Sequence, residues 1–248
     1  MPTAIQRVID AAKKLSRDVD RLSFADPVTH VYNPLNYAWA AHQQYIELAN
    51  PQTCRVLMLG MNPGPWGMAQ TGVPFGQIDA VKNWMNIDAK IGRPANEHEK
   101  RPIQGLDCPK SEVSGQRLWG LFREVYPQPE RFFAEHFIAN YCPLVFMEAS
   151  ARNRTPDKLP VGERQLLDEV CDEHLLKLLE ILRPQYAIGV GAYAEKCLKR
   201  VAKSMSQPPS QITRILHPSP ASPAANRGWA PQALQQLRDT GAWSAEAS

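Results

Sequence analysis

The hydrophobic positions of this chain first predict a set of amphipathic helices. Between residues 3 and 22 an apolar residue recurs every three or four positions, with lysine and arginine residues in between. This is the spacing of a helix with one buried face. The same spacing predicts a long helix over residues 161–182, which Pro184 ends. Further helices are predicted at residues 37–48, 79–84, 115–126, 192–201 and 230–237.

Shorter apolar runs between these helices predict buried strands. They lie at residues 56–59, 137–139, 186–190 and 211–216, and each is followed by glycine, proline or polar residues. Strands that alternate with helices along a chain are typical of a parallel sheet with helices on both faces. We therefore expect an α/β fold in one domain over residues 1–248, with an N-terminal helix at about 3–22 and a frayed tail at about 240–248.

Two stretches predict connections on the surface. Residues 92–114 are polar and contain Arg93-Pro94 and Arg101-Pro102, so we expect a long exposed connection. Residues 153–160 predict a surface loop.

Composition places the chain among ordinary globular proteins. Hydrophobic residues make up 44% and charged residues 21% of the chain, which argues against global disorder or a coiled coil. The net charge of +3 is compatible with a polyanionic partner without demanding one. No apolar run approaches a membrane span and the N-terminus lacks a secretory signal. We therefore expect no membrane association and a cytoplasmic protein, located at the nucleoid in a bacterium or in the nucleus in a eukaryote.

The five cysteines argue against cysteine-based sites. They are odd in number, widely scattered and include no Cys-x-x-Cys pair. A disulfide framework, a zinc site and an iron–sulfur cluster are therefore not expected.

The stretch after the first predicted strand is the most distinctive of the chain. Residues 60–76 (GMNPGPWGMAQTGVPFG) hold five glycines, three prolines and no lysine. Glycines let the backbone approach a ligand closely, and prolines keep a loop rigid. The carboxyl end of a strand is also where open α/β sheets bind ligands. The loop suits a flat, partly polar ligand better than a phosphate, which would favour lysine followed by serine or threonine.

Three loops are expected to meet at this edge of a parallel sheet, namely residues 60–76, 140–144 and 217–229. Asn62 can hold a water molecule, Asn140 can bind the polar edge of a ligand, and His217 can donate a proton to a developing anion. The loops hold no aspartate or glutamate. A reaction whose leaving group departs as a stabilised anion therefore fits better than one that needs a strong general base.

Together, GMNPGPWGMAQTGVPFG, NYCPL (140–144) and HPSPASPAANRGW (217–229) resemble the single-strand-selective monofunctional uracil-DNA glycosylases, within the uracil-DNA glycosylase superfamily. The resemblance extends over most of residues 37–237. It implies a three-layer α/β sandwich around a central, mainly parallel four-stranded sheet.

The resemblance also implies an activity. A protein of this family would hydrolyse the N-glycosidic bond of uracil, and of 5-hydroxymethyluracil, in single- and double-stranded DNA, and would leave an abasic site in base excision repair. It would need no metal or cofactor. Because the three loops hold no lysine for a Schiff base, strand cleavage is not expected. A single-domain enzyme that works on DNA is most simply a monomer.

Carried onto this sequence, the resemblance implies roles for four residues at the reacting base. The catalytic residues would be Asn62, which would position the hydrolytic water, and His217, which would stabilise negative charge on uracil O2. Phe75 would stack on the flipped base. Asn140 would read the Watson–Crick edge of the base and reject cytosine. Enzymes that act on a base must first take it out of the stack, which explains why such a set is needed.

The resemblance implies further contacts to the base and to the DNA. Met61 and Gly64 would form the wall near C5 of the base, where the small Gly64 leaves space for a hydroxymethyl group. Ser219 would lie near a phosphate, and Arg227 would act as a wedge in the duplex. Residues 221–222 are alanine and serine where vertebrate members carry arginine and asparagine, which removes two polar contacts from the wedge loop.

Three other functions stay open from the sequence. A glycosylase for xanthine or hypoxanthine would differ in one or two side chains, with Met61 as the first suspect. A non-catalytic nucleic-acid-binding module would bind DNA without releasing any base. A hydrolase with Cys142 or Ser219 as nucleophile would lose activity on alkylation or in Ser219→Ala, while Asn62 would be dispensable.

Overall fold

A four-stranded parallel sheet forms the centre of the computed structural model, which describes residues 2–243. Its strands run in the order β3-β2-β6-β7, and all three neighbouring pairs are parallel. The predicted α/β fold with a central four-stranded parallel sheet is therefore confirmed. The strands are β2 (Val56–Gly60), β3 (His136–Asn140), β6 (Tyr186–Val190) and β7 (Gln211–Ile215).

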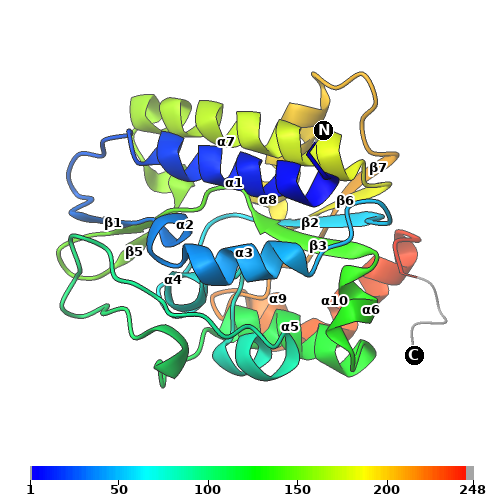
Figure 1. Cartoon of the computed structure of the whole chain (residues 1–248), viewed down its shortest axis with the longest axis horizontal. Helices are drawn as coiled ribbons and strands as arrows, with labels where there is room; N and C mark the ends of the chain where they lie inside the picture. Colours follow the sequence, from blue (N-terminus) through cyan, green and yellow to red (C-terminus); the bar gives the residue numbers. More distant parts are fainter. Residues whose placement is uncertain (1, 244–248) are drawn as a thin grey trace.

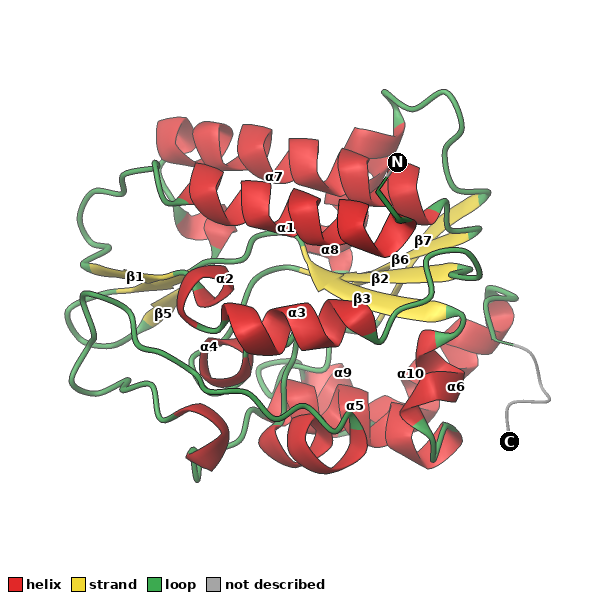
Figure 2. Cartoon of the chain, viewed as in Figure 1, coloured by secondary structure: helices red, strands yellow, loops and turns green. Residues whose placement is uncertain are grey.

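Helices cover both faces of this sheet, as Figures 1 and 2 show. The helices above the strands in Figure 1 are α1 (Ala4–Val19), α7 (Val161–Leu182) and α8 (Ala192–Ala202), and those below are α5 (Val113–Val125), α6 (Pro129–Phe133) and α10 (Trp229–Asp239). A further helix, α3 (Trp39–Glu47), lies along β3, where the hydroxyl of Tyr45 donates to the carbonyl of Ile138 at 2.7 Å. The outer edge of β3 is thereby covered, which protects it from pairing with another chain.

A second, antiparallel sheet was not predicted. It has the order β1-β4-β5. Strands of two or three residues are too short to show an alternating pattern, so no local pattern in the sequence indicates them. Its strands are β1 (His30–Tyr32), β4 (Val145–Met147) and β5 (Asn153–Arg154), and the remaining short elements are α2 (Pro34–Tyr37), α4 (Met68–Thr71), α9 (Pro223–Asn226), a π-helical turn at Ala80–Trp84 and 3-10 turns at Gly105–Asp107 and Pro156–Lys158.

Two expectations about local structure need correction. The helix predicted over residues 37–48 begins at Trp39, as α3, and Ala38 separates it from the short α2 that ends at Tyr37. The segment 92–114 is not a simple exposed connection, because Ile103 is buried in a cluster with Tyr32 of the second sheet. The hydroxyl of Tyr32 also donates to the carbonyl of Arg101 at 2.9 Å. This segment therefore packs against the second sheet, which the sequence did not reveal.

The end of the chain differs from the predicted frayed tail. Trp243 is buried, and its ring stacks on that of Phe122 with 5.5 Å between the centroids. The chain therefore remains part of the hydrophobic core as far as Trp243. Residues 244–248 lie outside the described residues.

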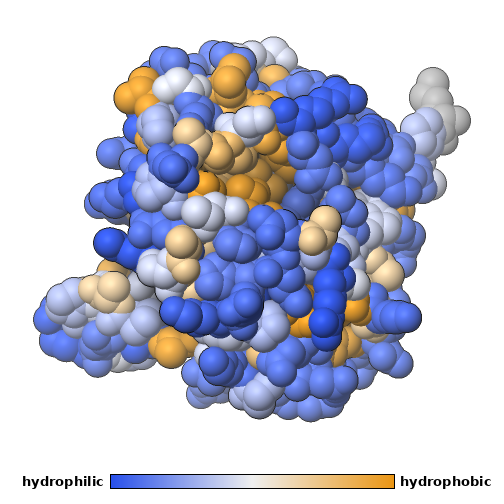
Figure 3. Space-filling view, turned by 90° about the vertical axis from the view of Figure 1, so that its left-hand side faces the viewer, coloured by the Kyte–Doolittle hydropathy of each residue, from blue (hydrophilic) through white to orange (hydrophobic). Residues whose placement is uncertain are grey.

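One face of the molecule, drawn in Figure 3, is mostly hydrophilic. Figure 3 shows the face at the left of Figure 1, where an apolar area in the upper part is surrounded by hydrophilic side chains. Within residues 2–243, no helix combines the length and the apolar character that crossing a bilayer requires.

Candidate active site

The structure brings the three motif loops to one edge of the parallel sheet. Gly60 at the end of β2 is paired with Asn140 at the end of β3, and Val190 at the end of β6 is paired with Ile215 at the end of β7. Since parallel strands end on the same side, the loops that follow β2, β3 and β7 start at the same edge of the sheet. The ring centroids of Phe75 and His217, from the first and third loops, lie 6.4 Å apart.

The side chain of Asn62 is held in one orientation. Its amide nitrogen donates to the carbonyl of Leu144 at 3.1 Å and to that of Pro63 at 3.3 Å. Because both partners are acceptors, the NH₂ group must face them and Oδ1 is directed away. The residue is half-buried. Asn62 therefore offers a fixed hydrogen-bond acceptor at the edge of the sheet, which is what binding a water molecule requires.

Asn140 ends β3 with a buried side chain whose hydrogen-bonding capacity is largely unused. Its Oδ1 has no hydrogen-bond partner among the described residues, and its Nδ2 contacts only the weakly accepting sulfur of Met68, at 3.3 Å. A buried amide without good partners destabilises the fold unless a ligand completes it. The geometry therefore suits a ligand edge that presents both a donor and an acceptor.

Gly60 makes the close approach of these groups possible. A Cβ atom built on Gly60 would overlap Oδ1 of Asn140 and would lie 2.6 Å from Cε2 of Phe75. The amide of Asn140 and the ring of Phe75 therefore both rest on the bare backbone of Gly60. Phe75 itself has φ of 54°, a strained value for a residue with a side chain, and such strain is concentrated at functional sites.

His217 follows β7 and presents one defined tautomer. The backbone N–H of Ser219 donates to its Nδ1 at 3.1 Å, so in the neutral ring the proton is on Nε2. Burial lowers the pKa of His217 below its usual value. The side chain is therefore a neutral hydrogen-bond donor through Nε2, suited to a developing oxyanion.

The loop after His217 is held by an arginine that the sequence did not single out. Arg117 of α5 donates to the carbonyls of Pro218 at 3.0 Å and Ser219 at 3.4 Å, and to Oδ1 of Asn226 at 2.9 Å. The hydroxyl of Ser219 accepts from the backbone N–H of residue 221 at 3.1 Å. Arg227 is exposed on the same loop. The loop is therefore ordered by α5 and leaves the Arg227 side chain exposed to solvent.

A carboxylate reaches the first loop from outside it. The carboxyl group of Glu112, which precedes α5, lies against Gly64 and Gly67, where a Cβ atom built on Gly64 would be 2.8 Å from Cδ of Glu112. The three loops hold no acidic residue, but the site as a whole therefore does. Burial raises the pKa of Glu112 to about 7. The space that we expected beside Gly64 is occupied by this carboxyl group.

Met61 is half-buried next to Asn62, and its carbonyl accepts from the N–H of Cys142 at 2.9 Å.

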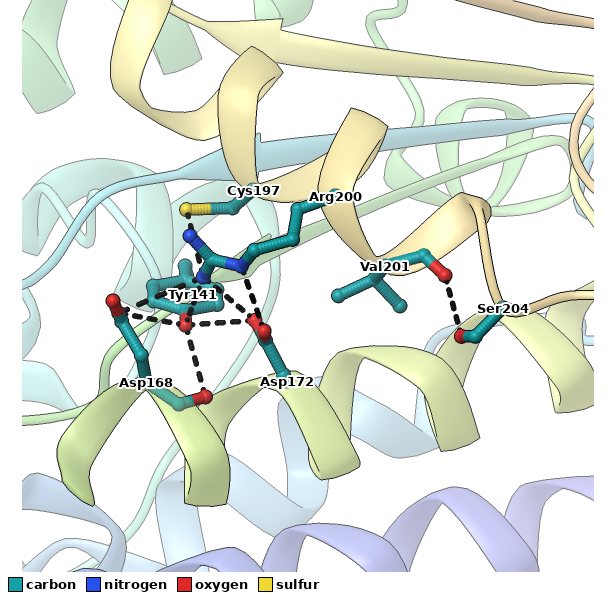
Figure 4. A network of polar contacts seen from close by, with 7 residues as sticks. All are labelled: Tyr141, Asp168, Asp172, Cys197, Arg200, Val201 and Ser204. Atoms are coloured by element: carbon teal, nitrogen blue, oxygen red, sulfur yellow. Dashed lines mark hydrogen bonds and ion pairs between the residues drawn. The ribbon is translucent and has the colours of Figure 1, made fainter. Parts of the chain in front are cut away.

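The second loop is fixed to α7 and α8 by the polar network in Figure 4. The hydroxyl of Tyr141 accepts from Arg200 at 2.7 Å and lies 2.9 Å from Oδ1 of Asp168 and 2.8 Å from Oδ1 of Asp172. Arg200 also forms two hydrogen bonds with Asp172, at 2.7 and 2.8 Å. The partly exposed Arg200 side chain is therefore paired within this network, which fixes Tyr141, the residue next to Asn140.

Other chemistries find little support in the geometry. Cys142 is fully buried and its sulfur accepts from the N–H of Leu144 at 3.4 Å, so it is not placed as a nucleophile. Within the part of the chain that the structure describes, no three histidine, cysteine or acidic side chains are grouped to hold a metal ion.

Comparisons with known proteins show which family this chain resembles. The family model of the uracil DNA glycosylase superfamily matches residues 46–238. The chain is 44% identical over 228 residues to a single-strand selective monofunctional uracil-DNA glycosylase of Rattus norvegicus, covering 92% of this chain and 82% of the relative. The chain is also 44% identical to a single-strand selective monofunctional uracil DNA glycosylase of Bos taurus, over 92% of this chain and 84% of the relative. The crystal structure of wild-type Pedobacter heparinus SMUG2 superposes with a TM-score of 0.62 at 18% identity, over 94% of this chain and 99% of that one, which supports the fold.

Proposed function

The chain belongs to the uracil DNA glycosylase superfamily, within its single-strand selective monofunctional family, and on this premise we propose that it releases uracil from DNA through the site described above. The observation that carries the proposal is one arrangement at the end of the parallel sheet. Asn62 presents a fixed acceptor, His217 presents a neutral N–H donor, and Asn140 presents a buried amide without good partners. Hydrolysis of an N-glycosidic bond is served by a bound water and a donor to the leaving base, and selection of the base is served by an amide that pairs with its edge.

Recognition of the base uses Phe75 and Asn140. A uracil flipped out of the stack would place its face on the ring of Phe75. Its N3–H would donate to Oδ1 of Asn140, and its O4 would accept from Nδ2. Cytosine has an acceptor at N3 and a donor at position 4, so it would leave the buried amide unpaired, and a site of this kind rejects such analogues strongly.

Bond cleavage uses Asn62 and His217. As the bond between C1′ and N1 breaks, its electron pair leaves with the base, and the negative charge gathers on O2. The Nε2–H of His217 would donate to this oxygen. A water molecule held by Oδ1 of Asn62 would form the new bond to C1′, lose its proton to solvent and leave an abasic site. The departing base anion then takes a proton from water.

Further contacts would extend the site. Met61 and Gly64 would form the wall near C5 of the base. We propose that the enzyme also releases 5-hydroxymethyluracil. Ser219 would lie near a phosphate, and Arg227 would enter the duplex as a wedge. We propose that the enzyme acts as a monomer on single- and double-stranded DNA, at the nucleoid of a bacterium or in a nucleus.

The test is release of free base from matched oligonucleotides that carry uracil, 5-hydroxymethyluracil, xanthine, hypoxanthine or thymine. Wild type is compared with Asn62→Ala and His217→Ala, and with His30→Ala as a control outside the site. We expect uracil release to fall at least about 100-fold in both site variants and to persist in the control. Release of purines in place of uracil would favour the xanthine or hypoxanthine enzyme. DNA binding without release of any base would favour the non-catalytic module.

A further inference from the structure

The carboxyl group of Glu112 has no hydrogen-bond partner, although it is in contact with the proposed active site. Its Oε2 is buried and receives no hydrogen bond from any described residue. Glu112 occupies the position before the first residue of α5, yet its side chain does not cap this helix. A serine, aspartate or similar residue there would normally accept from the free N–H groups of the first turn. The side chain is therefore directed toward something else.

The neighbours of this carboxyl group belong to the loop between Asn62 and Phe75. Cβ atoms built on Gly64 and Gly67 would both overlap Oε2 of Glu112. Gly64 lies two residues after Asn62. One turn further along α5, Gly115 lies against the carbonyl of Phe75, where a built Cβ would be 3.2 Å from the carbonyl carbon. Glu112 is therefore located at the site, on the side of the loop where a side chain of residue 64 would project.

This placement is unfavourable for a carboxylate unless something binds to it. Removing a carboxylate from water without a partner destabilises the folded state, and here burial alone raises its pKa. The glycines beneath it offer backbone surface but no cation. The Oε2 atom is buried, whereas Glu112 and Gly64 as whole residues are half-buried, so a ligand group that binds beside Gly64 would contact the carboxyl group directly. Titratable groups whose pKa is shifted by burial are concentrated at functional sites.

We propose that Glu112 is a specificity-determining residue, which accepts a hydrogen bond from a hydroxyl group on C5 of the flipped pyrimidine and disfavours a methyl group there. The inference rests on the proposed function, in which Gly64 faces C5. The hydroxymethyl group of 5-hydroxymethyluracil can supply the missing donor. The methyl group of thymine would cover the carboxylate without pairing with it. Uracil, with only hydrogen at C5, neither pairs with the carboxylate nor covers it further.

The experiment measures kcat/KM for release of uracil, 5-hydroxymethyluracil and thymine from single-stranded oligonucleotides at pH 8, where Glu112 is mostly ionised. The variants are Glu112→Leu, which is apolar, and Glu112→Gln, which is nearly isosteric. The matched control is Glu124→Gln, at an exposed position of the same helix. Thermal unfolding of every variant shows whether it is folded.

We expect Glu112→Leu to lower the ratio of 5-hydroxymethyluracil to uracil release at least about 10-fold and to raise the ratio of thymine to uracil by a similar factor. Glu112→Gln keeps a neutral acceptor, so in this variant the ratio of 5-hydroxymethyluracil to uracil release falls only several-fold. Glu124→Gln leaves both ratios unchanged. If Glu112→Leu does not fold, the release ratios of Glu112→Gln alone test the proposal.

An equal loss on all three substrates would overturn the proposal, because it would mean that Glu112 supports the loop or acts on the water in every reaction. Unchanged ratios in a folded Glu112→Gln would overturn it as well. Failure of the proposed function would look different, since the wild type would then release neither uracil nor 5-hydroxymethyluracil.

Discussion

The backbone N–H of Ser219 donates to Nδ1 of His217 at 3.1 Å, and this bond places the imidazole proton on Nε2. Burial also lowers the pKa of His217, so the ring stays neutral at pH values below its usual 6.5. We expect ¹⁵N NMR to find the neutral Nε2–H tautomer at pH 7. Ser219→Ala keeps the backbone donor and the tautomer, whereas Ser219→Pro removes the donor and gives a mixture. A protonated ring, or one with its proton on Nδ1, would contradict this assignment.

Gly60→Ala is expected to abolish most of the activity without unfolding the protein. The added methyl group would overlap Oδ1 of Asn140 and press on the ring of Phe75, and displacement of reactive groups by about 1 Å costs about 100-fold in rate. We expect kcat/KM for uracil release to fall about 100-fold. The control is Gly120→Ala on α5, where a built Cβ meets no atom within 4 Å. Equal activity of both variants would show that Gly60 is not needed for close approach.

Arg117→Met is expected to weaken DNA binding more than the chemical step. The variant loses the hydrogen bonds to the carbonyls of Pro218 and Ser219, so the loop that carries Arg227 becomes less ordered. We predict a rise in KM of about 10-fold on duplex DNA, with a smaller change in kcat. The control is Arg131→Met, at an exposed position of α6. A change in kcat alone would argue instead that Arg117 acts on His217.

Tyr141→Phe is expected to lower stability because it removes the centre of a partly exposed polar network. Arg200 and Asp172 would each lose the tyrosine hydroxyl as a partner, and because water can replace it in part, we expect a cost of about 0.5–1.5 kcal/mol. Urea unfolding measures the change. Tyr193→Phe is the control, since the Tyr193 ring packs on Tyr141 with centroids 6.0 Å apart while its hydroxyl has no partner among the described residues. Equal stabilities of the two variants would argue against the network.

Glu112→Gln is expected to change the dependence of stability on pH. Glu112 has a pKa of about 7 in the folded state and 4.5 in the unfolded state, so between these values the folded protein binds more protons. The unfolding free energy of the wild type therefore falls, relative to the variant, as pH rises from 4.5 to 7, by about 3 kcal/mol in total. Urea unfolding of both proteins at pH 5 and pH 8 measures this difference. A difference that is independent of pH would contradict the buried, unpaired carboxylate.

The local pattern of the sequence was enough for the main sheet and its helices. Four apolar runs became β2, β3, β6 and β7, and the apolar spacing of residues 161–182 became α7. These features are visible because the residues that form one buried face recur at regular intervals in the chain. The motif loops were equally visible, since their glycines, prolines and asparagines follow the strands directly.

The contacts that complete the site were decided only by the tertiary structure. Glu112 lies in the segment predicted as an exposed connection, and Arg117 lies in the helix predicted over residues 115–126. Nothing in either pattern indicates that Glu112 reaches Gly64 or that Arg117 reaches Pro218. The predictions of a frayed tail and of an exposed connection were wrong for a similar reason. Trp243 and Ile103 are buried by residues that are distant in sequence, and a local pattern does not show such contacts.

The sequence by itself therefore determined the α/β fold, the order of the four main strands and their helices, and the loops that carry Asn62, Asn140 and His217. The tertiary structure decided the orientation of Asn62, the tautomer of His217 and the presence of a carboxylate beside Gly64. The physical reason is that periodicity reports which face of an element is buried. Hydrogen-bond partners depend instead on distances between elements, which exist only after the chain has folded.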